Sequence, residues 1–413
     1  MKPTLGWAGL SRSALKRAEA QLLSDSEGMR DEVGVLSLHT GYANRFFPGT
    51  SVQQSRLRYA LFVPWQIRLL LQQGDKILQG QVRSTLEKAE LTLAKRLPDV
   101  DGAGTIGRRT AKLGKPVAIA PSQSYWVALG AWGILHRGPF DVVPSRTELF
   151  SRWQHWPDGS RNRSLETDNE NRPLYSIARL FHPRLPDPPN EFLGQGPLDF
   201  RLGAKEKEFL RLRLLDTQRA KDKMPSYLAN LVRSSADIGA QQHPWNAALA
   251  KLADPADQAA LQRARHAASL AAVARAVYNA MVESLQEDRD RMTVTDKHRE
   301  HLRAIVAEHS QSAQRLVLYQ LPIDGVLIGA LADVLTTLQA WLRKGERNPL
   351  ASEIYETFAS WELQRKGPRR ARLPKSAAAR QARTEWDGEK VSRATSIEYR
   401  WSLVQRLLSD LEE

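Results

Sequence analysis

A long helical segment in the second half of the chain constrains the fold more than any other feature. It begins at Asp254 and Pro255, and its apolar residues keep helical spacing to about Gln286. Aspartate caps a helix by accepting its free backbone N–H groups, and proline suits the first helical position, where no N–H is needed. The sequence therefore predicts one long helix that begins at residue 255.

Helical spacing also dominates the rest of the chain, whereas the alternation typical of strands is rare. Three short segments could form strands: Pro116–Ala120, Val142–Val143 and Arg315–Tyr319. The predicted fold class is a mainly α, multi-helix array with minor β content. Further helices are predicted over Ser11–Leu23, Asp31–Phe47, Ser51–Gln73, Leu78–Leu97, Ser122–Ile134, Ala204–Thr217, Thr295–Gln314, Pro322–Leu342, Pro349–Leu363 and Ser396–Leu411.

Prolines and polar residues concentrate between residues 137 and 200. Such a composition favours an irregular connection over regular secondary structure. The sequence therefore predicts two helical domains, residues 1–136 and 201–413, joined by a proline-rich irregular segment over 137–200.

The chain is strongly basic: 60 lysines and arginines against 46 acidic residues give a net charge of +14. Such a surface attracts polyanions, of which phosphate backbones are the most common in a cell. The charge is also clustered, since residues 365–383 carry eight basic residues and no acid. A generally basic surface without a specific partner is the alternative interpretation.

The basic clusters supply the predicted nucleic-acid contacts. Segment 365–383 is the main predicted contact, and a mobile, solvated linker is the alternative for it. Gly367-Pro368 and Pro374 keep it from forming one helix. The predicted contact residues are Arg365, Lys366, Arg369, Arg370, Arg372, Lys375, Arg380, Arg383, Arg108, Arg109, Arg56 and Arg58.

Composition also excludes several classes of protein. The chain has no cysteine, which excludes disulfides, thiolate metal sites and cysteine nucleophiles. No apolar run approaches the length of a membrane span, and the N-terminus lacks the apolar region of an export signal. We therefore expect a cytoplasmic protein without a membrane partner.

Searches for catalytic and metal-binding motifs support no enzymatic site and no cofactor. The chain has no phosphate-binding GxxxxGK[ST] loop, no GxSxG elbow, no HxK pair and no acid two residues before a lysine. His298, His301 and His309 are interpreted as solvated residues on a helix surface rather than as a metal site. A catalytic site assembled from scattered residues stays open.

The sequence GAGTIG at residues 102–107 matches the pattern of a dinucleotide-binding loop. Such a loop needs a strand before it and an acidic residue about 20 positions later, and neither is present. Two interpretations are left, a flexible loop or a close approach to phosphate assisted by Arg108 and Arg109.

Residues 46–65, FFPGTSVQQSRLRYALFVPW, combine a turn, a helix and a Pro-Trp pair. Thr50 or Ser51 is predicted to cap the helix, and Pro64 to end it and begin the next. Arg56 and Arg58 lie about 200° apart on a helix. We therefore expect one of them to be paired inside the fold and the other to reach a partner or a phosphate.

This segment resembles the signature of an uncharacterised bacterial family, a domain of unknown function found in anti-phage defence islands. The shared core is FPGTSxxQxRxRYxLFxPW. The resemblance implies a genomic context and co-encoded partners such as a helicase, a phospholipase-D-like nuclease or a methyltransferase. Weaker similarity extends to Leu5–Trp7, Thr105–Arg109, Pro121–Trp126, Ala131–Leu135, Ala276–Met281 and Tyr399–Trp401.

Charge and resemblance together predict a non-enzymatic, nucleic-acid-binding accessory subunit of a bacterial antiviral defence system. Its expected ligand is duplex DNA, bound with weak dependence on sequence. The alternative is a protein–protein scaffold that bridges helicase and nuclease components without touching DNA. An enzyme of novel design is a third interpretation.

Overall fold

The computed structural model is mainly α-helical, which confirms the predicted fold class. In the part of the chain that it describes, no strand forms, and the only β pairings are isolated bridges from Leu135 to Phe181 and from Gln218 to Pro225. The described residues are 31–73, 77, 79–115, 117, 119–136, 143–151, 153, 180–234, 236–346, 348–351 and 353–413. The predicted helix Ser11–Leu23 and the Leu5–Trp7 block lie outside them.

The predicted long helix is α12, Pro255–Asp288. The side chain of Asp254 accepts a hydrogen bond of 2.8 Å from the backbone N–H of Asp257, as a helix cap does. Small residues let neighbouring helices approach α12 closely, and its alanines from Ala264 to Ala276 are buried. Packed around it are α13 (Lys297–Gln314), α14 (Leu331–Lys344), α15 (Glu353–Lys366), α16 (Ala377–Thr384) and η6 (Pro349–Ala351).

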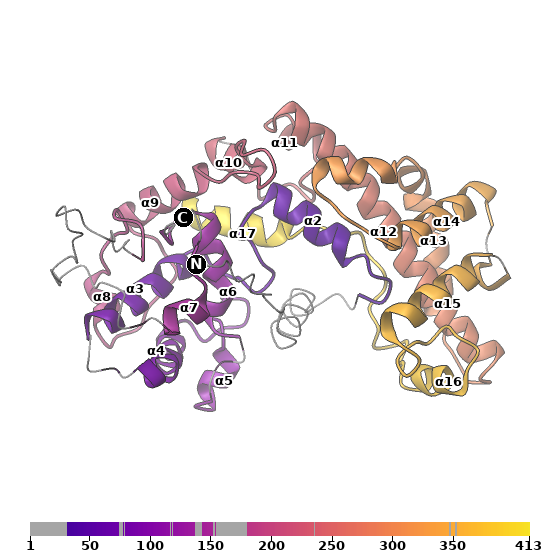
Figure 1. The fold of residues 1–413 in the computed structure, drawn as a ribbon, viewed down its shortest axis with the longest axis horizontal. Coiled ribbons are helices and arrows are strands. Elements are labelled where there is room, and N and C mark those ends of the chain that lie inside the picture. The colour runs from indigo at the N-terminus through magenta and orange to yellow at the C-terminus, as the bar shows by residue number, and fades with distance from the viewer. Residues whose placement is uncertain are drawn as a thin grey trace, which may run out of the picture.

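A second lobe lies on the left of Figure 1, and α2 (Leu36–Phe46) lies between the two lobes. The other helices of the described chain are α3 (Tyr59–Gln72), η2 (Gln79–Gln81), α4 (Val82–Arg96), α5 (Arg108–Lys112), α6 (Pro121–Ala131), α7 (Arg146–Ser151), α8 (Asn190–Leu193), α9 (Ala204–Leu215), α10 (Tyr227–Arg233), α11 (Ala247–Ala250), η5 (Leu318–Asp324) and α17 (Trp401–Glu412).

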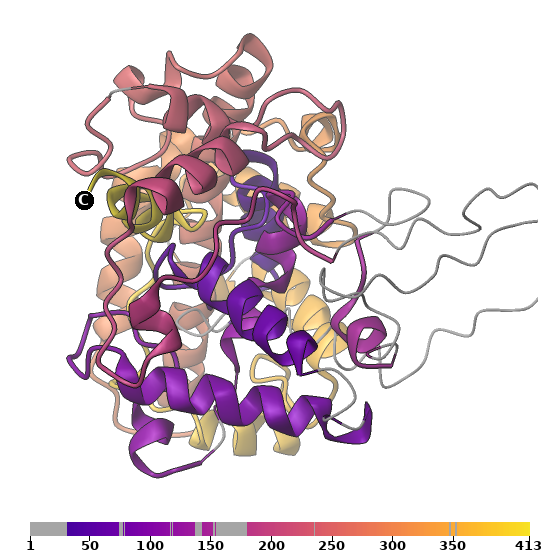
Figure 2. The same cartoon turned by 90° about the vertical axis from the view of Figure 1, so that its left-hand side faces the viewer.

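The C-terminal helix α17 belongs to this second lobe, beside helices from the first half of the chain (Figures 1 and 2). The backbone N–H of Leu57 donates a 2.6 Å hydrogen bond to Oδ2 of Asp410. Arg58 and Glu206 pair across the predicted 137–200 connection. The predicted domain boundaries stay a prediction, and these contacts join segments on both sides of them.

The predicted helix Ser51–Gln73 is shorter in the structure, because α3 begins only at Tyr59. The N–H groups of Ser55 and Arg56 are bound by the hydroxyl of Tyr125 instead of by a helix cap. The predicted helix cap at Thr50 or Ser51 is therefore wrong, and the hydroxyl of Thr50 donates to the carbonyl of Phe47.

Pro64 lies inside α3 and does not end it, contrary to the prediction. A proline inside a helix loses one backbone hydrogen bond. Every residue of α3 from Tyr59 to Ile67 is buried. The burial of these residues on all sides of the helix offsets the lost hydrogen bond, so the helix continues to Gln72.

The predicted helix Pro322–Leu342 is two elements, η5 and α14, separated by a short loop. Gly325 and Gly329 in this loop have φ angles of +79° and +50°, which a helix cannot contain. Thr295 is not a cap either, since Asp296 precedes α13 and the Thr295 hydroxyl pairs with Glu389. No described residue of the three strand candidates is in a strand.

None of the helices in the described ranges has the length and apolar character needed to cross a bilayer.

Candidate functional site

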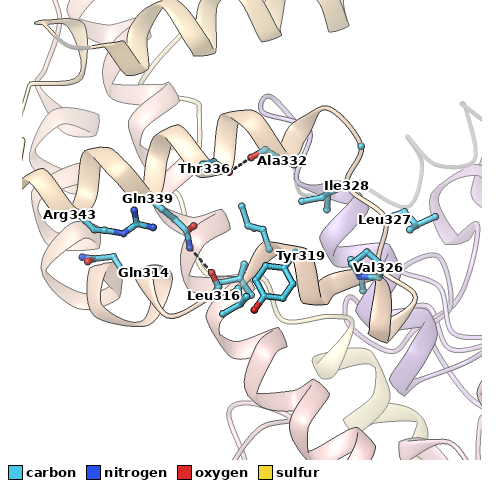
Figure 3. Close-up of a pocket in the computed structure, with 14 residues that line it drawn as sticks. Gln314, Leu316, Tyr319, Val326, Leu327, Ile328, Ala332, Thr336, Gln339 and Arg343 are labelled. Atoms are coloured by element: carbon cyan, nitrogen blue, oxygen red, sulfur yellow. Dashed lines mark hydrogen bonds between the residues drawn. The ribbon is translucent and has the colours of Figure 1, made fainter.

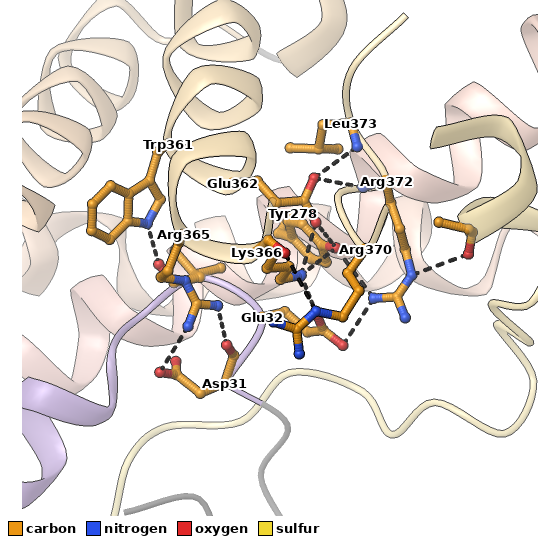
Figure 4. Close-up of polar contacts among 12 residues, drawn as sticks. Asp31, Glu32, Tyr278, Trp361, Glu362, Arg365, Lys366, Arg370, Arg372 and Leu373 are labelled. Atoms are coloured by element: carbon orange, nitrogen blue, oxygen red, sulfur yellow. Dashed lines mark hydrogen bonds and ion pairs between the residues drawn. The ribbon is translucent and has the colours of Figure 1, made fainter. Parts of the chain in front are cut away.

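Half of the basic segment 365–383 is part of a buried ionic network rather than a free surface (Figure 4). Lys366 pairs with Glu32 and, at 2.8 Å, with Oε1 of Glu362. Arg372 reaches Oε1 of Glu32 at 3.0 Å. The acidic partners are Glu32, near the start of the described chain, and Glu362 of α15. The cations of 365–383 are therefore not free, although the segment itself contains no acidic residue.

Glu362 is the centre of this network and is 1% exposed. Its Oε1 accepts the hydroxyl of Tyr278 at 2.6 Å, and its Oε2 accepts the backbone N–H groups of Arg372 and Leu373 at 2.8 and 2.7 Å. Burial, together with Glu362, raises the pKa of Tyr278 well above its usual range, so this hydroxyl stays a donor. The network fixes the backbone that follows Gly367.

Arg383 forms a second buried pair. Its Nε and Nη2 bind the two carboxylate oxygens of Asp290 at 2.6 and 2.9 Å, and the two side chains are 1% and 2% exposed. The hydrogen bond from Arg383 lowers the pKa of Asp290. Arg365 likewise pairs with Asp31. The side chain of Arg383 is therefore not available to a ligand, whereas Arg365 is paired but stays exposed.

Besides Arg365, four cations of the segment are exposed, and we call these four the exposed set: Arg369, Arg370, Lys375 and Arg380. Arg369 and Arg370 form no ion pair with any described residue, and Arg370 donates only to the carbonyl of Lys366. Lys375 and Arg380 face Glu356 and Asp290 at the long distances of 3.6 and 3.8 Å.

The segment is neither a linker nor one helix. Helix α15 ends at Lys366 and α16 begins at Ala377, as Gly367-Pro368 and Pro374 predicted. Between the helices, Ala371 and Leu373 are buried and the backbone is held by Glu362. The interpretation as a mobile, solvated linker is therefore wrong.

The second predicted contact, Arg108 and Arg109, lies on the short helix α5. Arg108 pairs with Asp99 and Asp101, whereas Arg109 is exposed and has no ion pair in the described chain. Lys112 on the same helix is 58% exposed and reaches Asp99 at 2.7 Å. Lys115, just beyond the helix, is exposed as well.

The glycine-rich loop before α5 is fixed by packing. Its Gly104 has a φ of +93°, and a side chain there would come within 2.7 Å of Cγ of Arg56. The carbonyl of Gly104 accepts the hydroxyl of Ser55, and the N–H of Ile106 donates to the hydroxyl of Tyr59. The loop approaches protein closely, so the interpretation as a flexible loop is wrong.

Arg56 and Arg58 are both paired inside the fold. Arg58 is 3% exposed and binds Glu206 at 2.9 Å, with Glu191 and Asp199 nearby. Arg56 binds the buried carboxylate of Asp410 at 2.7 Å. The expectation that one of the two reaches a partner is therefore not met.

The predicted contact residues that stay accessible consequently lie on α5 and in segment 365–383. In Figure 1, α5 lies at the lower edge of one lobe and α16 at the lower edge of the other. Both helices are again at the lower edge in the perpendicular view of Figure 2. The exposed set and the α5 cations Arg109, Lys112 and Lys115 thus form two exposed basic clusters, one under each lobe.

Sequence reasoning missed a polar cavity of about 880 Å³ between α12, α13 and two loops. His243 stacks on Trp245 at its rim, with ring centres 4.8 Å apart, and Arg265 also lines it. His301 and His309 line the cavity, and Nε2 of His301 lies 2.7 Å from the carbonyl of Ala394. Burial lowers the pKa of His243 and His309, so both are neutral at pH 7 and offer hydrogen bonds to a polar ligand.

The interpretation of the three α13 histidines as solvated surface residues is corrected by these positions. His298 is 1% exposed, and its Nε2 lies 2.9 Å from the carbonyl of Gly388. Among the described residues, no group of three or more histidines or acidic residues is arranged to hold a metal ion.

Comparison with known proteins places the chain in a family. Residues 4–302 match a family of unknown function, DUF6361, and the chain belongs to that family. Comparisons with curated proteins and with solved structures gave no match. The resemblance to a domain of unknown function is thus confirmed.

Proposed function

We propose that this protein is a non-enzymatic, nucleic-acid-binding accessory subunit of a bacterial antiviral defence system. The observation that carries the binding role is the exposure of the cations on α5 and around α16, of which Arg109, Arg369 and Arg370 have no ion pair in the described chain. Phosphate backbones are bound mainly by such sequence-independent contacts, so the ligand is duplex DNA with weak dependence on sequence. The resemblance of residues 46–65 supports the defence role.

The structure narrows the predicted contact residues to those that a phosphate can reach. Arg58, Arg372 and Arg383 are committed to acidic partners and are structural. Arg369 and Arg370 have no such partner in the described chain and can neutralise phosphate without breaking an ion pair. The exposed set is therefore the main contact, and Arg109, Lys112 and Lys115 are the second.

The test is the salt dependence of binding to a labelled duplex, measured by fluorescence anisotropy. The variant combines Arg369→Gln, Arg370→Gln and Lys375→Gln. Each neutralised phosphate adds about 0.9 to the slope of log affinity against log salt, so the slope should fall by about 0.9 for every phosphate that the variant no longer neutralises. Melting of the variant should be unchanged, because these side chains are exposed.

A matched control removes three other exposed lysines that have no ion pair in the described chain: Lys88→Gln, Lys205→Gln and Lys251→Gln. This control has the same net charge and should keep the slope of the unmodified protein. Equal slopes in variant and control would contradict the assignment of the site. A flat slope in the unmodified protein would contradict nucleic-acid binding altogether.

A protein–protein scaffold that bridges helicase and nuclease components is the second candidate. One separate observation favours it: three large apolar side chains of one short segment, Tyr319, Ile323 and Leu327, are exposed. Soluble proteins seldom expose apolar residues in groups unless a partner covers them. A basic surface and an apolar surface can serve in the same subunit, so the two candidates make separate predictions.

A further inference from the structure

An apolar groove lies between η5 and α14 and is lined by α14 along most of its length (Figure 3). Its volume is about 910 Å³, and its lining includes Leu316, Tyr319, Val326 and Ile328. A pocket of this size can take several apolar side chains. Tyr319 and Leu327 are 81% and 74% exposed, more than any other large apolar residue in the described chain.

The segment that presents these side chains is held firmly from beneath. Asp324 is buried and binds Nη2 and Nε of Arg263 at 2.6 and 2.7 Å. The hydroxyl of Tyr42 donates to the same carboxylate at 3.1 Å. Lys221 donates to the carbonyl of Ile323 at 2.9 Å. The exposure therefore results from a defined structure, and little ordering would be required on binding.

The loop between η5 and α14 is fixed in the same way. Val326 is fully buried and packs against Gly41 of α2. The backbone N–H of Val326 donates to the carbonyl of Leu321 at 3.1 Å. With Val326 anchored, the next residue, Leu327, is directed away from the core. A water-exposed leucine beside an anchored valine has no role in the stability of the fold.

The charge of the groove indicates the chemistry of its occupant. None of its lining residues is acidic, and its one charged residue is Arg343, near Gln314 at one end (Figure 3). Neither Arg343 nor the nearby Arg315 forms an ion pair with a described residue, and both are exposed. The amide nitrogen of Gln339 is used internally, by the carbonyls of Ala313 and Leu316. Arg343 is thus a cation at the end of an apolar groove.

We propose that this groove binds an amphipathic helix of a partner protein that carries apolar side chains and a carboxylate for Arg343. A small molecule inside the groove would leave Ile323 uncovered, since it is 59% exposed and lies outside the lining. A helix covers the groove and its rim together. This inference does not depend on nucleic-acid binding.

The probe is a synthetic helical peptide with leucines at positions i, i+3, i+4 and i+7 between glutamates. A second peptide replaces the glutamates by lysines. The full-length protein should bind the glutamate peptide about tenfold or more tightly than the lysine peptide, as one well-placed ion pair allows. Binding is measured by fluorescence anisotropy at physiological salt.

Three variants locate the site. Tyr319→Ser combined with Leu327→Ser should weaken binding of the glutamate peptide by about tenfold or more. Arg343→Gln should remove the preference for glutamate and keep the apolar contribution. The matched control, Val100→Ser combined with Leu113→Ser, changes two other exposed apolar residues and should bind as the unmodified protein does. Circular dichroism melting should be unchanged in all three.

Several results would overturn the proposal. Equal affinity for both peptides, no binding of either, or unchanged binding by the Tyr319/Leu327 variant would each do so. Sedimentation velocity tests the other occupant, a second copy of this chain. A dimer that the Leu327→Ser substitution dissociates would show that the groove is a self-association surface and not a partner site.

Discussion

Two basic regions of this molecule have similar compositions but differ in how many of their cations are buried in ion pairs. In residues 365–383, Lys366, Arg372 and Arg383 turn inward to acids supplied by distant parts of the chain. In the α5 region, Arg109 and Lys115 stay on the surface. The segment with no local acid is thus the more neutralised one, because tertiary structure and not sequence distance decides which charges meet.

The comparison also shows what a buried positive charge requires. Removing a guanidinium from water is costly, and a close carboxylate with good geometry is needed to compensate. Arg383 meets this condition with two hydrogen bonds to Asp290. Exposed cations need no such partner, and they remain available for ligands.

The largest expected effect is that of breaking the buried pair. Arg383→Met leaves the carboxylate of Asp290 buried without its cation, which should lower the free energy of unfolding by about 3–5 kcal/mol. The measurement is urea unfolding monitored by circular dichroism. Combining the change with Asp290→Leu should restore most of the loss, since an apolar pair replaces an ionic one. Equal unfolding free energies for Arg383→Met and Arg109→Met would contradict the view that buried pairing of Arg383 stabilises the fold.

The next effect concerns Arg56 and Arg58. Because both bind carboxylates that are themselves buried, Arg56→Ala and Arg58→Ala should each cost about 2–4 kcal/mol of unfolding free energy. Neither should change the salt slope of DNA binding at temperatures where the variant is folded. A variant that melts normally but binds DNA less tightly would show that the substituted arginine contacts DNA.

The buried imidazole of His39, which pairs with no described carboxylate, should have a smaller effect on stability, and this effect depends on pH. Burial, with a contribution from Arg400, lowers the pKa of His39 to about 3, so the imidazole is neutral in the fold. The unfolded chain takes up a proton near pH 6.5, so this part of the stability is complete above pH 6.5 and is lost as the pH falls. Between pH 7 and 5 the loss should be about 2 kcal/mol.

His39→Leu removes this titration. The unfolding free energy of the unmodified protein, minus that of the variant, should therefore fall by about 2 kcal/mol from pH 7 to pH 5 and change little from pH 7 to pH 8. If the unfolding free energies of the two proteins change in parallel from pH 5 to pH 8, folding does not change the pKa of His39.

The smallest expected effect on stability is that of the α5 cations. The combination of Arg109→Gln, Lys112→Gln and Lys115→Gln should change the unfolding free energy by less than about 0.5 kcal/mol. It should nevertheless reduce the salt slope for duplex DNA. An unchanged slope would show that the α5 cations do not contact DNA. The exposed set would then be the only proposed contact, and the two basic regions would differ in function as well as in structure.

Local signals in the sequence predicted the helices well. Asp254 and Pro255 begin α12 as expected, because a cap and a proline act on neighbouring backbone groups only. Gly367-Pro368 and Pro374 likewise separate α15 from α16. Pro64 was misjudged, because the packing of α3 outweighs the local preference of a proline.

The candidate sites could be predicted only in part. Positive charge predicted the contact segments, which stay a prediction, whereas the partner of Arg383 lies 93 residues away and has no sequence signature. The groove at η5 was hidden because Tyr319 and Leu327 look like core residues in an apolar stretch. The turn at Gly325 and Gly329, where both φ angles are positive, separates η5 from α14, and the apolar spacing of this stretch did not predict it. The two glycines within this apolar stretch were the one available signal of that turn.

The hydrogen bond between Leu57 and Asp410 has a consequence for how the protein is made. The two residues are 353 positions apart, and ribosomes add roughly 5–20 residues per second. The lobe around α3 therefore waits roughly 20–70 s during synthesis before α17 exists to complete it. During that interval its apolar surface is open to chaperones and to other nascent chains, so slow or stalled translation of the last helix should favour aggregation.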